Sequence, residues 1–385
     1  MTGMPEAGAA QRRGASQMAR RLRGCRVRGT RLRRRASRRR AGALAQAVLA
    51  GACLLAGLGW PAGAALAQGA GAHAPLNGAR LSPPLSLPGF HSPPPDPTVS
   101  SGAVRAQPAR MPFYVATRGR LTIYLLGTLH VGDPRDYPPG EPFRRPILAA
   151  LAASPVLALE LSPDDLLESA DDVSRYGVCR YACLPKLLPE PLWQRLAARL
   201  RGNPAALDGI RRMRPWLAAL VVETYDSLSA GLQTEYGTEA QLQNVFLKKK
   251  GARVVGLETL AEQMRAFTGL TLAEQREMLA QDLVQTPAQN AADVQALHRL
   301  WRIGDADALA AWDSAKAERL ARSRPVAEAM DNKILYERNR RFAARSIALA
   351  GANRPLFVAI GALHLGGPKG VIELLKRQGF RVDAG

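Results

Sequence analysis

The chain has few aromatic residues, and this scarcity limits the classes of protein to which it can belong. Phenylalanine, tryptophan and tyrosine make up 5% of its 385 residues. That content excludes a surface rich in stacking side chains, of the kind that binds single-stranded nucleic acid. The hydrophobic fraction of 47% still supports a sizeable buried core, in one large domain or in two of ordinary size.

Acidic residues are almost absent from the first 67 positions. This stretch holds 14 of the 53 basic residues, all of them arginine, and a single acid, Glu6. The formal charge of +21 would at face value indicate a nucleic acid or an anionic membrane as partner. The rest of the chain has 39 basic and 31 acidic residues, so its charge is only +8. We therefore expect no nucleic-acid partner.

The arginine cluster precedes an uncharged apolar stretch, residues 41–60, and a small-residue tract that ends at Ala67. This order is typical of a secretory signal peptide over residues 1–67, with cleavage after Ala67. It predicts a periplasmic or secreted protein. The alternative is an uncleaved leader that anchors the chain to the inner membrane, because about 20 apolar residues can span a bilayer.

Residues 68–112 contain ten prolines and few large apolar side chains. Such a segment buries too little surface to offset its chain entropy, so the sequence predicts a disordered linker. The folded domain is expected over residues 113–385. Contact with a membrane is expected only through the leader, if the leader is not cleaved.

Cysteine is also scarce, and two of the four cysteines lie in the predicted leader. The other two, Cys179 and Cys183, are separated by three residues. In an oxidising compartment this spacing predicts a short-loop disulfide, and the alternative is a pair of free thiols. A metal site at these cysteines is not favoured, because no histidine or further cysteine lies nearby.

Short apolar runs alternate with amphipathic helical patterns in the predicted domain. This alternation predicts an α/β fold, with a mainly parallel central sheet flanked by helices and a mostly helical middle region. Buried strands are expected at 121–127, 155–161, 252–258 and 355–361, with a last strand-like segment after residue 379. Helices are expected at 143–153, 190–201, 214–230, 238–250, 259–267, 271–284, 291–303, 305–321, 326–350 and 368–378.

Four polar residues stand at the ends of the four predicted strands. His130 and His364 each close a G-x-x-H motif, Glu160 lies in the second strand, and Glu258 follows the third. Carboxyl ends of parallel strands meet at one edge of a sheet, so we expect these side chains to converge. Two imidazoles and a carboxylate suit a divalent zinc, manganese or cobalt ion that activates water. The predicted domain has one other histidine, His298, which is expected only to pack in a helix.

The paired G-x-x-H motifs, the LALELS and GLET carboxylates and the LYERN segment resemble the TraB/GumN family. That family is related to the TIKI metalloproteases and, more remotely, to erythromycin esterase and ChaN-like proteins. The resemblance runs from Leu121 to the carboxyl terminus and implies an α/β fold of two related halves. It also implies site roles for Arg338 and Asn339. One departure is Glu239, where the family usually has Gly-x-Asp.

These residues lead to the hypothesis of a metal-dependent hydrolase that cleaves a peptide amide. His130, Glu160 and His364 would hold the metal, Glu258 would act as general base, and Arg338 would stabilise developing charge. The alternative for Arg338 is a solvated basic helix face shared with neighbouring arginines. Two other functions remain open: a non-catalytic protein that binds a peptide or a haem-like ligand in the same cleft, and a metal-independent esterase with a histidine base.

Overall fold

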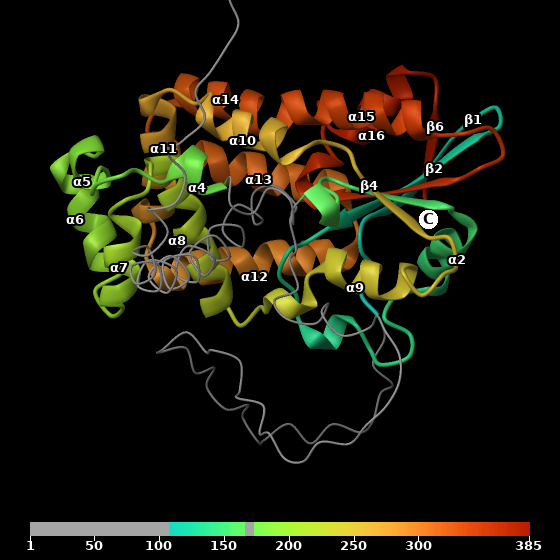
Figure 1. Cartoon of the computed structure of the whole chain (residues 1–385), viewed down its shortest axis with the longest axis horizontal. Helices are drawn as coiled ribbons and strands as arrows, with labels where there is room; N and C mark the ends of the chain where they lie inside the picture. The colour runs from blue at the N-terminus through green and yellow to red at the C-terminus, as the bar shows by residue number, and fades with distance from the viewer. Residues whose placement is uncertain (1–107, 166–172) are drawn as a thin grey trace, which may run out of the picture. The chain divides into compact units, whose positions relative to one another are not determined.

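The computed structural model describes residues 108–165 and 173–385 (Figure 1). The predicted leader and most of the predicted linker lie outside these residues. No helix in the described ranges combines the length and the apolar character needed to cross a bilayer. The described strands are β1 (Phe113–Arg118), β2 (Leu121–Thr128), β3 (Val156–Leu159), β4 (Arg253–Gly256), β5 (Leu356–Gly361) and β6 (Arg381–Ala384).

The strands form one mixed sheet in the order β4-β3-β5-β2-β1-β6. Four neighbouring strands, β4, β3, β5 and β2, run parallel, and they are the four predicted from apolar runs. The sequence did not predict β1, which forms an antiparallel hairpin with β2 and also pairs with β6. Gly119 has a φ of +57° in the hairpin turn, a conformation that glycine adopts without steric cost. The predicted α/β class is confirmed.

Helices cover both faces of the sheet (Figure 1). Helices α2 (Arg145–Ala153), α9 (Thr238–Phe246) and α12 (Pro287–Ile303) share a core with Leu126, Leu157 and Phe357. Helices α15 (Glu337–Leu349) and α16 (Val371–Arg377) pack in a second core with Leu125, Ala158 and Val358. Neighbouring residues of one strand therefore face opposite layers, as the alternation of side chains in a strand requires. This double cover explains the continuous apolar runs of the parallel strands.

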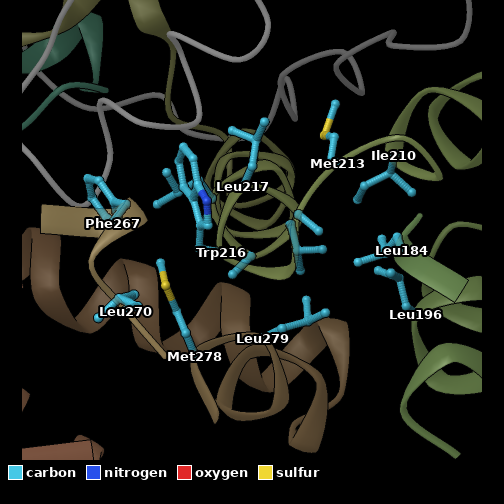
Figure 2. Packing of buried hydrophobic residues seen from close by; sticks show 14 of the residues in the cluster. Leu184, Leu196, Ile210, Met213, Trp216, Leu217, Phe267, Leu270, Met278 and Leu279 are labelled. Atoms are coloured by element: carbon cyan, nitrogen blue, oxygen red, sulfur yellow. The ribbon is translucent and has the colours of Figure 1, made fainter. Parts of the chain in front are cut away.

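The middle region is helical, as predicted, and has its own core around Trp216 (Figure 2). Trp216 is fully buried and stacks on Phe267, with ring centroids 5.3 Å apart. In Figure 2, Met278 and Leu279 approach from a neighbouring helix below. The helices of this region are α4 (Val173–Gly177), α5 (Leu184–Leu187), α6 (Glu190–Arg199), α7 (Pro204–Ile210), α8 (Pro215–Ser229), α10 (Leu260–Thr268), α11 (Leu272–Val284), α13 (Ala306–Leu320) and α14 (Arg324–Asp331).

The predicted helix 326–350 is not a single α-helix. Its first part is α14, its last part is α15, and between them lies the π-helical turn η3 (Asn332–Tyr336). A π-turn has i→i+5 hydrogen bonds and often occurs at functional sites. The hydrophobic periodicity spans both helices, so it could not reveal the turn between them.

Two further predictions concern the start of a helix and a disulfide. The helix predicted at 291–303 begins earlier, at Pro287, because Thr286 and Gln289 form a capping box and proline is well suited to the first helical position. Cys179 and Cys183 form the predicted disulfide, in the segment between α4 and α5.

Candidate functional site

The four predicted strand-end residues all lie at the carboxyl ends of parallel strands and are buried. Glu160 directly follows β3, Glu258 follows β4, and His130 follows β2. His364 ends the short turn η4 (Ala362–His364), which continues β5. The exposed fraction of each residue is between 1% and 6%. A residue from outside the sheet, Arg338 of α15, connects three of them.

Arg338 is fully buried and lies between two carboxylates. Its Nε donates to Glu258 Oε1 at 3.0 Å, and its Nη2 donates to the same oxygen at 2.6 Å and to Glu160 Oε2. Burial opposes the charged form, but the charges of Glu258 and Glu160 raise the pKa of Arg338 above its usual range. Arg338 therefore stays charged, and it does not belong to a solvated basic face. It follows the π-turn η3 by two residues.

Glu160 has both carboxylate oxygens engaged. Oε1 accepts a hydrogen bond from the backbone N–H of Gly361 at 2.7 Å, and Oε2 accepts one from Arg338. Burial raises the pKa of Glu160 to about 8, although the charge of Arg338 lowers it in part. The nearby charge of Glu258 raises it further. One guanidinium serves two carboxylates here, so Glu160 can hold a proton near neutral pH.

His364 also has both ring nitrogens engaged. Its Nδ1 lies 2.5 Å from Asn339 Oδ1, and the amide nitrogen of Asn339 donates to the backbone oxygen of Lys369. That bond orients the amide so that its oxygen faces His364, which places the imidazole proton on Nδ1. Nε2, 3.2 Å from Arg338 Nη1, then accepts a hydrogen bond. Burial and the charge of Arg338 lower the pKa of His364 well below its usual range, so the ring is neutral.

His130 forms a second, separate pair with Glu239. Its Nδ1 lies 3.1 Å from Glu239 Oε1, but the angle does not meet hydrogen-bond geometry. Thr128 Oγ1 donates to the same oxygen. Glu239 is 3% exposed, and its Oε2 has no hydrogen-bond partner in the described ranges. The family resemblance leads us to expect aspartate at position 239. The longer side chain of Glu239 reaches the end of β2.

Gly237 allows this approach of α9 to β2. A Cβ atom at this position would lie 2.4 Å from the backbone oxygen of His130. Such a contact would force the start of α9 away from the strand end, and Glu239 with it. The glycine of the motif therefore serves the packing that positions the carboxylate.

A cavity of about 150 Å³ opens beside the two histidines. His130, Gly361 and His364 line it at the sheet edge, and residues of α8, α11, α12 and α13 line the rest. Glu160, Glu258 and Arg338 are not among its lining residues. The predicted residues thus divide into two histidines at the cavity and a charged network behind them.

The predicted metal ligands are His130, Glu160 and His364, and Arg338 contacts two of them. Nε2 of His364 lies 3.7 Å from Glu160 Oε1, and the Arg338 guanidinium contacts both residues. In the part of the chain that the structure describes, no three His, Cys, Asp or Glu side chains are grouped to hold a metal ion. A guanidinium that donates to the same nitrogen and carboxylate does not fit a metal shared by His130, Glu160 and His364. The metal stays a prediction of the sequence.

Sequence patterns missed the other wall of the cavity. Acidic side chains line it, one or two from each of several helices that are far apart in the chain. A lone acid in an amphipathic helix looks like any solvated residue, so no motif marks them. His298 packs as predicted: it is buried, pairs with Asp136 and stacks on Trp301, although it also borders the cavity.

A model of the TraB/PrgY/gumN family matches residues 112–384. No curated protein and no solved structure gives a significant match. The matched range includes every residue of the Arg338 network and of the His130–Glu239 pair.

Proposed function

We propose, from the premise that the chain belongs to the TraB/PrgY/gumN family, that it is a hydrolase of amide or ester bonds in which His130 activates water. The observation that carries this proposal is the position of His130. It is 6% exposed, lines the cavity, and has a buried carboxylate beside Nδ1. A peptide amide is the first substrate class to test.

Glu239 supports His130 as a general base. A carboxylate beside Nδ1 favours the tautomer whose proton is on that nitrogen and stabilises the imidazolium that forms after proton transfer. Nε2 makes no hydrogen bond to another described residue, so it is available to a water molecule in the cavity. Catalytic hydrogen bonds are often imperfect before substrate binds, which accounts for the poor angle at Nδ1.

Arg338 supplies the fixed positive charge of the proposed site. It lies behind His364, whose ring borders the cavity, and is shielded from solvent. A buried charge acts strongly on negative charge that develops nearby, because the dielectric is low. Glu160 and Glu258 hold the guanidinium in place, so they are positioning residues in this proposal. The predicted role of Glu258 as base is not adopted, since its carboxylate contacts Arg338 and Gln263 instead of the cavity.

A metal-dependent mechanism is an alternative proposal, and a chelator distinguishes it from the histidine base. Zinc, manganese or cobalt at His364 and Glu160 would require Arg338 to leave both side chains. Activity that a chelator abolishes, and that one added divalent ion per chain restores, would favour the metal. Activity that survives the chelator would favour the histidine base.

The test is turnover by the full chain on a library of peptides and simple esters. His130→Ala should lower kcat by about a hundredfold to ten-thousandfold, the usual contribution of a general base. Glu239→Gln should lower kcat less, and Glu239→Asp should restore part of the loss. His298→Gln is the matched control, because His298 also borders the cavity but is held by Asp136.

Two outcomes would contradict the hydrolase. One is a folded chain that retains peptides without forming products, which would indicate the non-catalytic binding protein. The other is product formation that His130→Ala leaves unchanged.

A further inference from the structure

Five carboxylates line the cavity away from the sheet edge. Two of them are balanced by cations of the chain. Asp226 accepts two hydrogen bonds from Arg199, each 2.9 Å long. Asp293 Oδ2 lies 3.5 Å from Lys316 Nζ and 3.3 Å from Arg319 Nη2. The other three are Glu223 of α8, Asp282 of α11 and Asp313 of α13.

These three side chains make no hydrogen bond or ion pair within the described ranges. Lys316 is the one cationic side chain that lines the cavity there; it pairs with Asp293, and its charge lowers the pKa of each of the three acids only in part. Burial raises the pKa of Glu223 to about 7, and burial raises the pKa of Asp282 and of Asp313. The three residues are half-buried, and carboxylates that are partly removed from water without a close partner cost stability. An arrangement that the fold itself does not balance is typical of a functional site.

A second observation at the same cavity also indicates a ligand. His130 is more than nine-tenths buried and lines this cavity, and its Nε2 makes no hydrogen bond to another described residue. The unbalanced acids and the unsatisfied histidine therefore border one continuous space. A molecule in that space can reach both.

We propose that the substrate carries a cationic nitrogen, an ammonium or a guanidinium, that lies against the acidic wall of Glu223, Asp282 and Asp313 while the bond to be cleaved lies at His130. This inference rests on the proposed function, because it assigns the substrate class of the same site. When the cation binds, carboxyl groups that hold protons release them to the solvent, and the negative charges that result attract the cation.

An organic cation fits this wall better than a metal ion. Throughout residues 108–165 and 173–385, no three acidic or histidine side chains are close enough to share a metal. The ammonium of Lys316 already lies at this wall and interacts with the charge of Glu223. Apolar side chains, among them Leu232, Val294 and Leu297, also line the cavity and can cover the hydrocarbon part of a ligand.

Calorimetric titration of the full chain with three tripeptide amides tests the inference. Acetyl-Ala-norleucine-Ala-amide is neutral, acetyl-Ala-Lys-Ala-amide carries a side-chain ammonium, and Ala-norleucine-Ala-amide carries a terminal ammonium. At least one cationic peptide should bind about tenfold more tightly than the neutral one. The preferred peptide identifies the source of the cationic nitrogen. Binding should release protons, which repeating the titration in a second buffer measures.

The variant with Glu223→Gln, Asp282→Asn and Asp313→Asn should lose this preference. Its Tm should rise or stay unchanged, because the substitutions remove half-buried carboxylates that have no close cation; the single variant Asp313→Asn covers the case in which the triple variant does not fold. Glu318→Gln is the matched control: Glu318 lies on α13 as Asp313 does, but it is 63% exposed. Equal binding of all three peptides, no binding, or a preference that survives in the variants would overturn the inference.

Failure of this inference is distinguishable from failure of the proposed function. Products formed equally from neutral and cationic peptides would leave the hydrolase standing and remove the cationic substrate. Charge-dependent binding without products would remove the hydrolase and support recognition of the cation.

Discussion

The chain gathers acidic side chains in two regions, and only in one of them does every acid pair closely with a cation. At the sheet edge, Glu160 and Glu258 share Arg338, and every charged atom of the group has a partner close by. In the helical wall, Glu223, Asp282 and Asp313 line the same cavity without such a partner in the described part of the chain. The first region is complete within the fold. In our proposal, the cationic nitrogen of a substrate completes the second.

The paired residues at the sheet edge position the site, and in our proposal the unpaired acids of the helical wall bind the substrate. Removing a partner from a balanced buried group leaves an uncompensated charge and destabilises the protein. Removing an unbalanced charge relieves a cost and impairs only binding. Removing Arg338 and removing one of the three unpaired wall carboxylates should therefore change stability in opposite directions.

The largest effect is expected from Arg338→Met. The substitution leaves two buried carboxylates without their shared cation, so the free energy of unfolding should fall by about 3–5 kcal/mol. Chemical denaturation measures it. Arg340→Met, on the exposed side of the same helix, should change stability little. Equal stability of the two variants would mean that the sheet-edge group is not the balanced region described above.

A smaller loss is expected from Arg199→Met, which converts a balanced acid of the wall into an unbalanced one. The side chain of Arg199 is 5% exposed and donates hydrogen bonds to both carboxylate oxygens of Asp226. Part of the cost is avoided because Asn290 still donates to Asp226 and because the carboxyl group can take up a proton. The free energy of unfolding should fall by about 1–3 kcal/mol. Arg195→Met, exposed on the same helix, is the control, and an effect as large as that of Arg338→Met would argue against the distinction.

The smallest expected effect is on the pH dependence of stability. Burial raises the pKa of Glu223 from 4.5 to about 7, so between these values the folded state binds more protons than the unfolded state. The free energy of unfolding then falls as the pH rises through this window. Glu223→Gln should reduce the fall in Tm between about pH 5 and pH 7.5. Glu160, whose pKa is raised to about 8, contributes in the same direction, so some fall should remain. A Tm difference identical to that of Glu318→Gln would contradict this prediction.

Much of the sheet could be predicted from the sequence because its strands are buried on both faces. An unbroken apolar run such as 355–361 has few alternatives to a central strand. Strand β1 escaped prediction because only two of its six residues, Phe113 and Ala116, are buried, and it follows the proline-rich segment directly. The strand-end residues were found because strand direction alone places them at one edge.

The partners of those residues could not be predicted in the same way. Whether Arg338 faces solvent or the core depends on the helix register after residue 331, which the π-turn changes without a clear mark in the hydrophobic pattern. The acidic wall depends on how helices α8, α11 and α13 pack together. Each contributes one unbalanced carboxylate, and the three positions are separated by 31 residues or more. Only the tertiary fold brings them to one cavity.

The π-turn between α14 and α15 makes the charged network sensitive to the length of the chain. Each residue of an α-helix turns the following side chains by about 100°. If residues 332–336 wound as a regular α-helix with no change in chain length, Arg338 would rotate away from both glutamates. Deletion of one of these residues would offset that rotation, because a π-turn holds one residue more than an α-helical turn. For a relative of this chain, the number of residues between α14 and α15 is therefore as informative about the site as the residues themselves.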